Sequence, residues 1–397
     1  MISFNNFIAE ALDLQGLNAQ LMHLDHPHQK HILYNKAGAQ LALSLGKKMH
    51  KLYQTGDSKD IMVSRKVDGG VSVIIANRGG QISISTKSAF NKDPKINFTE
   101  EDIDRNHGKT PGLADTLKHV LKHAQGLVQD DRAVQGDLIY THNPNRPTNM
   151  EPVSNGTTTH NVPNRIGITH AGPPKAMAIA LHTEYDEHGI ARSGISPKTI
   201  RHKKDVFVAD TSFKVNPQHY DPKQQQAVEK HLANAEQLLK SYPQHFEVPD
   251  EHRDHLLTYM NSLSDGLEPG QIRKPNIDDY IQHLQNKGLK EAEKVKTEKS
   301  KQSKIDKFLE MGKDVRRNRQ QFNTLFKFHD HMHGVSQGLM STLPYNKASN
   351  FITDIDGKPS TDEGVVVADK RTGQIMGKYV PQTVVHELRH NPRFKRQ

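Results

Sequence analysis

The sequence predicts an α+β protein, with an antiparallel, β-rich core, N-terminal helices and a large helical insertion. Three observations predict this class. Short β-branched segments separated by glycine pairs begin near residue 61 and recur up to residue 210. The chain between residues 216 and 340 is instead strongly charged and rich in helix-forming residues. β-branched segments then return at 363–370 and 373–380, so we expect the end of the chain to complete the same core.

The N-terminal part predicts a helix. Within residues 30–54, apolar side chains such as Leu41 and Leu45 recur at helical spacing. Thr55-Gly56 follows, and a glycine just after the last periodic residue is typical of a helix C terminus. We therefore expect a helix of several turns that ends there and belongs to an N-terminal helical segment, residues 1–55.

The next segments predict strands and a second helix. IMVSRKV, VSVIIANR and QISISTK are separated by glycine pairs, which predicts a run of hairpins over residues 61–87. Residues 111–128 open with a proline, which is favoured in the first helical turn, and predict a helix. Further strands are expected at 133–141, 165–171, 175–185 and 205–210.

The composition shift divides the chain further. The first part of the core should occupy 56–215, the helical insertion 216–345, and the completion of the core with a basic tail 346–397. Residues 287–304 have hardly an apolar side chain and predict a solvated helix or a linker.

Bulk composition limits the possible functions. The chain has 397 residues and no cysteine, which excludes disulfides, thiolate zinc sites and cysteine nucleophiles. No apolar run approaches the ~18 residues of a membrane span, and the first residues lack a basic region and a cleavage site, so we expect neither a membrane segment nor a signal peptide. The net charge of +9 favours a polyanionic partner such as nucleic acid.

Lys66 lies at the end of a predicted strand, just before a tight glycine turn. A lysine that attacks phosphorus must be fixed in place and partly deprotonated, with acids nearby to hold a metal ion and cations to offset developing charge. Asp137 and Glu363 each lie at the edge of a predicted strand and are candidates for the acids. The candidate cations are Lys87, Lys92, Lys95, Lys370, Arg371 and Lys378.

These stretches resemble known motifs. Lys66-Val67-Asp68-Gly69 resembles motif I of the covalent nucleotidyltransferases, which include ATP-dependent DNA ligases, RNA ligases and capping enzymes. GDLIY, which contains Asp137, resembles motif III, and EGVVV, which begins at Glu363, resembles motif IV. The segments KVDG, TKSAFNK, QGDLIYT and HTEY are also similar to a group of uncharacterised tailed-phage proteins.

The resemblance implies a nucleotidyltransferase (ATP-grasp-like ligase) core that uses ATP and Mg²⁺. It implies a lysyl-AMP intermediate at Lys66, followed by AMP transfer to a nucleic acid and sealing. RNA is the expected substrate, because Val71 stands where DNA ligases have arginine. Asp137 and Glu363 would hold Mg²⁺, and the implied nucleotide-binding residues are Asp68, Gly69, Lys87, Asp137, Glu363 and Lys378. The expected location is the host cytoplasm, or the virion, of a bacteriophage.

The sequence also departs from the family's pattern. Asp137 replaces the usual glutamate, and the helical insertion separates it widely from Glu363. Lys378 is the one match to the lysine pair of motif V. His182 and Tyr185 are the candidates for the aromatic residue that stacks on the base.

Two alternatives remain open. The first is a non-enzymatic structural or nucleic-acid-associated phage protein on the same fold, because fold analogy alone does not establish activity. The second is a zinc metalloprotease. His386-Glu387-x-x-His390 has the spacing of a zinc-binding helix, but the short remainder of the chain supplies no third ligand and Pro392 would shorten the helix. The segment HDHMHG could contribute His329 or His333, although we expect these to be surface residues.

Overall fold

The computed structural model describes residues 35–381, apart from 58, 68–69, 142–149, 154–156, 162–165, 174, 186–190, 197, 264, 266–271, 342–349, 356–357 and 360–362. These residues form two units. The β-rich unit comprises Lys59–Lys214 and the described part of Leu343–Gly377. The helical unit comprises the described part of Asp25–Ser58, Val215–Thr342 and the first residues after Gly377.

The largest sheet of the β-rich unit has seven strands, in the order β10-β9-β5-β2-β3-β4, with β11 paired to β9. Its pairs are antiparallel except β9–β11, which is parallel. This confirms the predicted α+β class with antiparallel pairing. The strands are β2 (Ser72–Arg78), β3 (Gln81–Ser85), β4 (Ile96–Asn97), β5 (Arg132–Thr141), β9 (Met177–Tyr185), β10 (Ala191–Ser193) and β11 (Val206–Val208).

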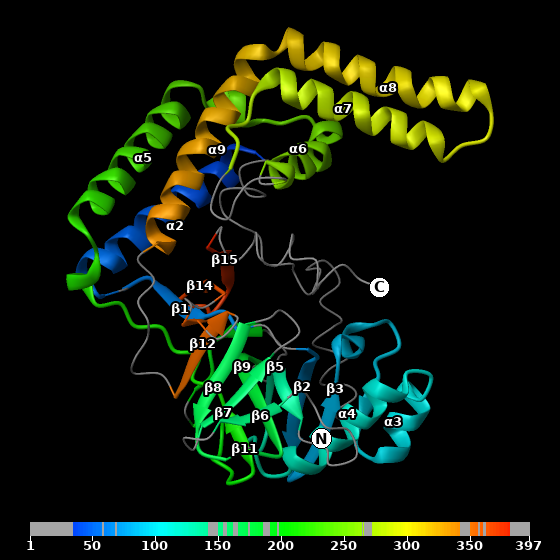
Figure 1. Ribbon diagram of the computed structural model, residues 1–397, viewed down its shortest axis with the longest axis vertical. Helices are drawn as coiled ribbons and strands as arrows, with labels where there is room; N and C mark the ends of the chain where they lie inside the picture. The colour runs from blue at the N-terminus through cyan, green and yellow to red at the C-terminus, as the bar shows by residue number, and fades with distance from the viewer. Residues whose placement is uncertain are drawn as a thin grey trace. The chain divides into compact units, whose positions relative to one another are not determined.

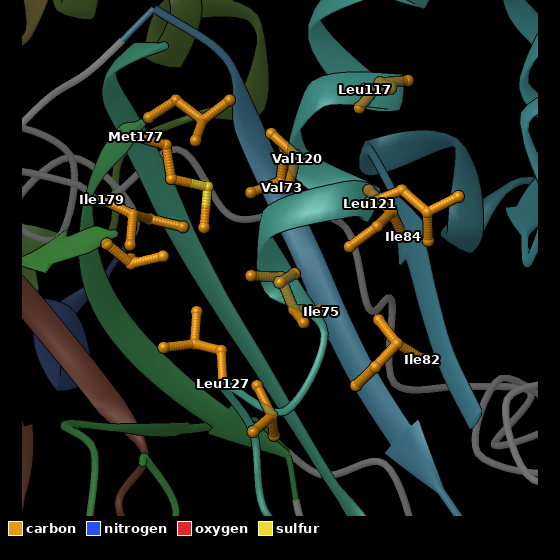
Figure 2. Close-up of a cluster of buried hydrophobic side chains, with 14 of the residues drawn as sticks. Val73, Ile75, Ile82, Ile84, Leu117, Val120, Leu121, Leu127, Met177 and Ile179 are labelled. Carbon is orange, nitrogen blue, oxygen red and sulfur yellow. The ribbon is translucent and has the colours of Figure 1, made fainter. Parts of the chain in front are cut away.

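Two helices accompany this sheet. Helix α3 (Glu100–His107) begins with a capping box in which Thr99 and Asp102 exchange hydrogen bonds, and α4 (Pro111–Ala124) begins at the predicted proline. Figure 2 shows Leu117, Val120 and Leu121 of α4 beside Val73 and Ile75 of the sheet. All five side chains are at most 6% exposed, so one face of the sheet is buried under α4.

A second sheet contains β1 (Ile61–Arg65), β14 (Val365–Asp369) and β15 (Ile375–Tyr379), in the order β1-β14-β15. The predicted hairpin between β1 and β2 is wrong, because β1 pairs with β14, with Arg65 opposite Val365. The predicted hairpin between β2 and β3 is correct, and Gly79 and Gly80 supply the positive φ angles of its tight turn. Local alternation identifies a strand but does not choose its partner.

A third sheet has five strands, in the order β13-β12-β8-β7-β6. These are β6 (Met150–Val153), β7 (Thr157–Asn161), β8 (Ile166–Ala171), β12 (Phe351–Ile355) and β13 (Lys358–Pro359). β12 follows the helical insertion in sequence yet pairs with β8, which precedes it. Two sheets of the β-rich unit therefore contain strands from both sides of the insertion (Figure 1).

The helical unit contains the insertion and the N-terminal helix. Its helices are α2 (Lys36–Thr55), α5 (Pro222–Ser241), α6 (Asp250–Ser262), α7 (Ile277–Glu293), α8 (Glu298–Arg317) and α9 (Arg319–Met340), with short turns η3 (Pro217–His219) and η4 (Pro243–Phe246). Gly56 caps α2 with a φ of 69°, as the sequence predicts. Residues 1–55 were expected to form an N-terminal helical segment, and α2, which lies in its described part, packs on α5 and α9 of the insertion.

Close helix packing in this unit depends on two glycines of α9. A Cβ on Gly334 would lie 2.5 Å from the ring of His231, and a Cβ on Gly338 would lie 2.5 Å from Val228 Cγ2. The two α5 side chains therefore pack directly on bare α9 backbone. Helices α7 and α8 lie side by side as a hairpin (Figure 1), so residues 287–304 are helical on both sides of a short turn.

The helical unit also corrects one expectation from the sequence. His329 and His333 were expected at the surface, but they are 1% and 7% exposed, with stacked rings 6.3 Å apart. They share a helix face with Leu325 and Met332, which points into the packed unit. Among the described residues, no helix is long and apolar enough to span a membrane.

Candidate functional site

Lys66 directly follows β1, and Glu363 binds its amine. The backbone N–H of Lys66 donates to the carbonyl oxygen of Gly364 at 2.8 Å, so β1 and the chain entering β14 are paired at this point. Lys66 Nζ donates to Glu363 Oε2 at 2.8 Å. Their side chains are 14% and 3% exposed. Because this ion pair is largely withdrawn from water, it holds the amine in one place.

Asp137 lies on β5, opposite Ser72 of β2. Burial by itself would raise the pKa of the Asp137 carboxyl group. The contacts with His182 and Ser72 and the positive charge of Lys66 outweigh burial and lower that pKa below its ordinary value. Asp137 therefore remains a carboxylate within electrostatic reach of Lys66. The structure thus brings together Lys66, Asp137 and Glu363.

His182 is adjacent to this group. Its Nε2 lies 3.8 Å from Asp137 Oδ2, and its Nδ1 lies 2.8 Å from Thr183 Oγ1. The sequence suggested His182 as a residue that stacks on a base, whereas both of its ring nitrogens face polar groups of β5 and β9. We call Lys66, Glu363, Asp137 and His182 the Lys66 cluster.

A hydrogen-bonded chain extends along the sheet from this cluster. The Tyr185 hydroxyl donates to Gln135 Oε1, and Gln135 Nε2 donates to Ser72 Oγ at 3.1 Å. Tyr185 is only 8% exposed and packs beside Phe90, so its ring is not open for stacking on a base. Gln135 and Ser72 were not identified from the sequence. The sequence did contain a signal for Gln135, because its i, i+2 spacing from Asp137 can place both side chains on one face of the sheet.

Arg65 was also missed. It is 3% exposed, and its guanidinium carbon lies 3.8 Å from the ring centroid of Phe351, a cation–π contact. The signal was an arginine at the end of the otherwise apolar strand IMVSR. Arg65 and Lys66 are consecutive, so two cations are packed into the β-rich unit at the end of β1.

The other predicted cations lie in several local settings. Lys87 is exposed in the turn η2 (Lys87–Phe90), and Lys92 is exposed after it. Lys95 Nζ donates to the carbonyl oxygen of Asn106 near the end of α3, which is a structural contact. Lys370 and Arg371 belong to the turn between β14 and β15, and Lys378 is half-buried in β15. In the part of the chain that the structure describes, no hydrogen bond or ion pair joins Lys87 to the Lys66 cluster.

Several predicted residues lie outside the described residues. These are Asp68, Gly69, His386, Glu387 and His390. Within the described ranges, no group of three or more His, Asp or Glu side chains is arranged to hold a metal ion. The buried pair His329 and His333 accordingly lacks a third ligand of these types among the described residues.

The Lys66 cluster nevertheless fits Mg²⁺ when the ion is shared with a ligand. Mg²⁺ is commonly bound by one or two carboxylates together with substrate phosphates and water. Glu363 supplies a carboxylate in contact with the Lys66 amine, and Asp137 supplies a second one within electrostatic reach of it, with its pKa held below the ordinary value. Asp137 and Glu363 would hold the ion, and it would offset the charge of bound phosphates.

Among comparisons with known proteins, the model of a family of unknown function (DUF6267) matches residues 18–382. No curated protein matches, and no solved structure matches.

Proposed function

Because the chain belongs to the DUF6267 family, for which no function is described, we propose a function from the site itself: an ATP-dependent nucleotidyltransferase of the RNA-ligase type, with Lys66 as its nucleophile. The observation that carries the proposal is the 2.8 Å contact between Lys66 Nζ and Glu363 Oε2, in a site that also holds Asp137. An amine held in place by Glu363, within electrostatic reach of Asp137, meets the positional requirement for attack on a metal-bound phosphate, and release from Glu363 frees it to act as the nucleophile.

The first step would join AMP to Lys66. The lone pair of the deprotonated Nζ attacks the α-phosphorus of ATP, a phosphorus–nitrogen bond forms, and the bond to the bridging oxygen breaks. Pyrophosphate leaves, and the proton lost by Nζ passes to water. The ion pair with Glu363 keeps Nζ at the site before ATP arrives, and the incoming nucleotide must displace that contact.

The second part of the reaction would use the stored AMP. A nucleic-acid 5′-phosphate attacks the lysyl-bound phosphorus and releases the free amine of Lys66. A 3′-hydroxyl then attacks the activated 5′-phosphate, and AMP leaves. RNA is the proposed substrate because of the RNA-ligase-like sequence around Lys66. The net charge of +9 supports binding to a phosphate backbone.

The direct test is covalent labelling. The full chain is incubated with Mg²⁺ and ATP labelled at the α-phosphate. We expect a labelled protein band that survives base, releases AMP in acid, and is at least 100-fold weaker in Lys66→Ala and Lys66→Arg. Lys66→Arg preserves the charge facing Glu363, so a loss of label there reflects the missing nucleophile rather than unfolding.

A matched control is Lys118→Ala. Lys118 of α4 belongs to the same unit, and its Nζ contacts Asp104 of α3 at 2.7 Å. Its label should equal that of the unchanged protein. If the folded wild-type protein takes no label, or if Lys66→Arg keeps it, the proposal fails, and a non-enzymatic role on this fold becomes the better explanation.

A further inference from the structure

We propose that His182 is a positioning residue that orients the Asp137 carboxylate for metal binding. The inference rests on the proposed function, because Asp137 is a metal ligand only within it. No stacking on a base is needed for this role. Three features of the two strands lead to it: a β-bulge, a glycine opposite the bulge, and the bonds of the imidazole ring.

The first feature is an irregularity in the pairing of β5 with β9. Gln135 lies opposite Thr183, but the next residue, Gly136, lies opposite Leu181. His182 is therefore an extra residue with no partner on β5, which is the pattern of a β-bulge. A bulge changes the direction of a side chain and commonly occurs next to active sites. The N–H of Gly194 donates to the carbonyl oxygen of His182 at 2.8 Å and fixes the bulged backbone.

The second feature is Gly136. A Cβ at this position would lie 2.6 Å from the carbonyl oxygen of Ala180 and 2.9 Å from Leu181 Cα. Both are backbone atoms, which cannot turn away as a side chain can. The two strands can approach this closely only because residue 136 has no side chain. The sequence QGD on β5 therefore matches the bulge on β9.

The third feature is the setting of the imidazole. Thr183 Oγ1, 2.8 Å from Nδ1, fixes the rotation of the ring, and Nε2 then lies 3.8 Å from Asp137 Oδ2. At this distance Nε2 faces the carboxylate without a full hydrogen bond, and the two side chains form an ion pair only when the imidazole carries a second proton. Ser72 contacts Asp137 from β2, so the carboxylate is held from the strands on both sides. Partners that orient a metal-binding carboxylate typically account for about 10- to 100-fold in metal affinity.

The test measures binding of Mn²⁺, as a substitute for Mg²⁺, to the full chain by electron paramagnetic resonance, with α,β-methylene-ATP present to supply the phosphates that share the ion without transferring AMP. Bound Mn²⁺ that is lost in the Glu363→Gln variant is assigned to the Lys66 cluster. We expect His182→Ala to weaken binding of this class about 10- to 100-fold, while the unfolding temperature stays unchanged. His182→Gln places an amide donor near the position of Nε2 and should recover most of the affinity. His202→Ala, which removes an exposed histidine of the same unit, should have no effect.

The outcomes separate this inference from the proposed function. If Mn²⁺ binding responds as expected but no AMP is transferred to Lys66, the proposed function fails and the role of His182 stands. If AMP is transferred but His182→Ala leaves the Mn²⁺ affinity unchanged, the role of His182 is refuted. It is also refuted if the unchanged protein has no Mn²⁺ class that depends on Glu363.

Discussion

The β-rich unit and the helical unit bury polar groups in different ways. The β-rich unit buries charges beside opposite charges, as in the pair Lys66 and Glu363. The helical unit buries histidines, and burial lowers the pKa of His252 and lowers that of His329 to about 3, so both rings are neutral at pH 7. The first unit therefore keeps an ion pair in its interior, whereas the second buries neutral imidazole rings as part of its packing.

The two units also differ in the origin of their contacts. Lys66 and Glu363 come from opposite sides of the helical insertion. In the helical unit, residues such as His252 and Tyr280, whose Nδ1 and hydroxyl lie 3.0 Å apart, come from neighbouring helices of one continuous segment. Removing Glu363 should therefore disrupt a contact between distant parts of the chain, whereas removing Tyr280 should disrupt a contact within one continuous segment.

The largest effect is expected from removing one member of the buried ion pair. Glu363→Ala leaves the Lys66 ammonium group without its carboxylate and should lower the free energy of unfolding of the β-rich unit by about 3–5 kcal/mol. Urea denaturation, followed by hydrogen exchange of β1 and β14, measures this loss.

A double variant provides the control for that prediction. Lys66→Met combined with Glu363→Leu removes both charges and should recover most of the lost stability. Asp104→Ala removes an exposed ion pair with Lys118 and should cost under about 1 kcal/mol. Equal losses for Glu363→Ala and Asp104→Ala would show that burial of the first pair has no energetic importance.

The next largest difference should come from glycine substitutions, one in each unit. Gly136→Ala would place its Cβ against backbone of β9, which cannot move easily, and should cost up to about 3 kcal/mol. Gly334→Ala meets the ring of His231 instead, and alanine favours a helix by about 1 kcal/mol, so its net cost should be smaller. Denaturation midpoints of the two variants decide the order, and a larger cost for Gly334→Ala would contradict it.

Mild acid should weaken the helical unit more than the β-rich unit. In the helical unit, burial lowers the pKa of several described histidines. They are His231, His252, His255, His283, His329 and His331. In the β-rich unit, burial lowers the pKa of His107 and His170. Below pH 6.5 these histidines are protonated in the unfolded chain but stay neutral in the native structure. The free energy of unfolding is therefore at its full value above pH 6.5 and falls as the pH drops.

The magnitude of this acid effect can be tested at His329. With a native pKa of about 3, this one residue should reduce stability by about 2 kcal/mol between pH 7 and pH 5. Hydrogen exchange of α9 at both pH values measures it. His329→Gln has no group that titrates in this range, so its pH dependence should be smaller by that amount. An unchanged pH dependence would mean that His329 titrates normally.

The smallest effects are expected at the helix N termini, where the two units should behave alike. Thr99 caps α3 by accepting from the N–H of Asp102, and Asn276 caps α7 by accepting from the N–H of Asp279. Replacing either cap by alanine should cost about 1 kcal/mol. Thermal unfolding of Thr99→Ala and Asn276→Ala provides the comparison, and a difference well above 1 kcal/mol would show that one cap has a further role.

Local chemistry made most elements predictable from the sequence. The C terminus of α2 at Gly56, the start of α4 at Pro111 and the β2–β3 turn at Gly79 depend on residues within a few positions of one another. The pairing of β1 was not predictable in this way. Both β2 and β14 offer apolar strands of suitable length, and the choice depends on packing across the whole unit.

The candidate site was predictable in part for the same reason. Lys66, Asp137 and Glu363 stood out because each is a charge at the end or edge of an apolar strand. The role of His182 could not be foreseen, since it depends on a one-residue shift between β5 and β9. His329 and His333 were misjudged because a polar ring in a histidine-rich chain was expected at the surface, yet among the described histidines only His202 and His219 are exposed. Composition does not show which face of α9 is covered.

The pairing of β1 with β14 has a consequence for biosynthesis. Arg65 lies opposite Val365, 300 positions later, so the ribosome must add those residues before the strand has its partner. At ordinary translation rates this takes about 15 to 60 s. The helices encoded in between are complete during that wait, whereas the apolar strand IMVSR leaves the exit tunnel early with an open edge. A nascent chain paused before residue 365 should therefore be the form most in need of a chaperone.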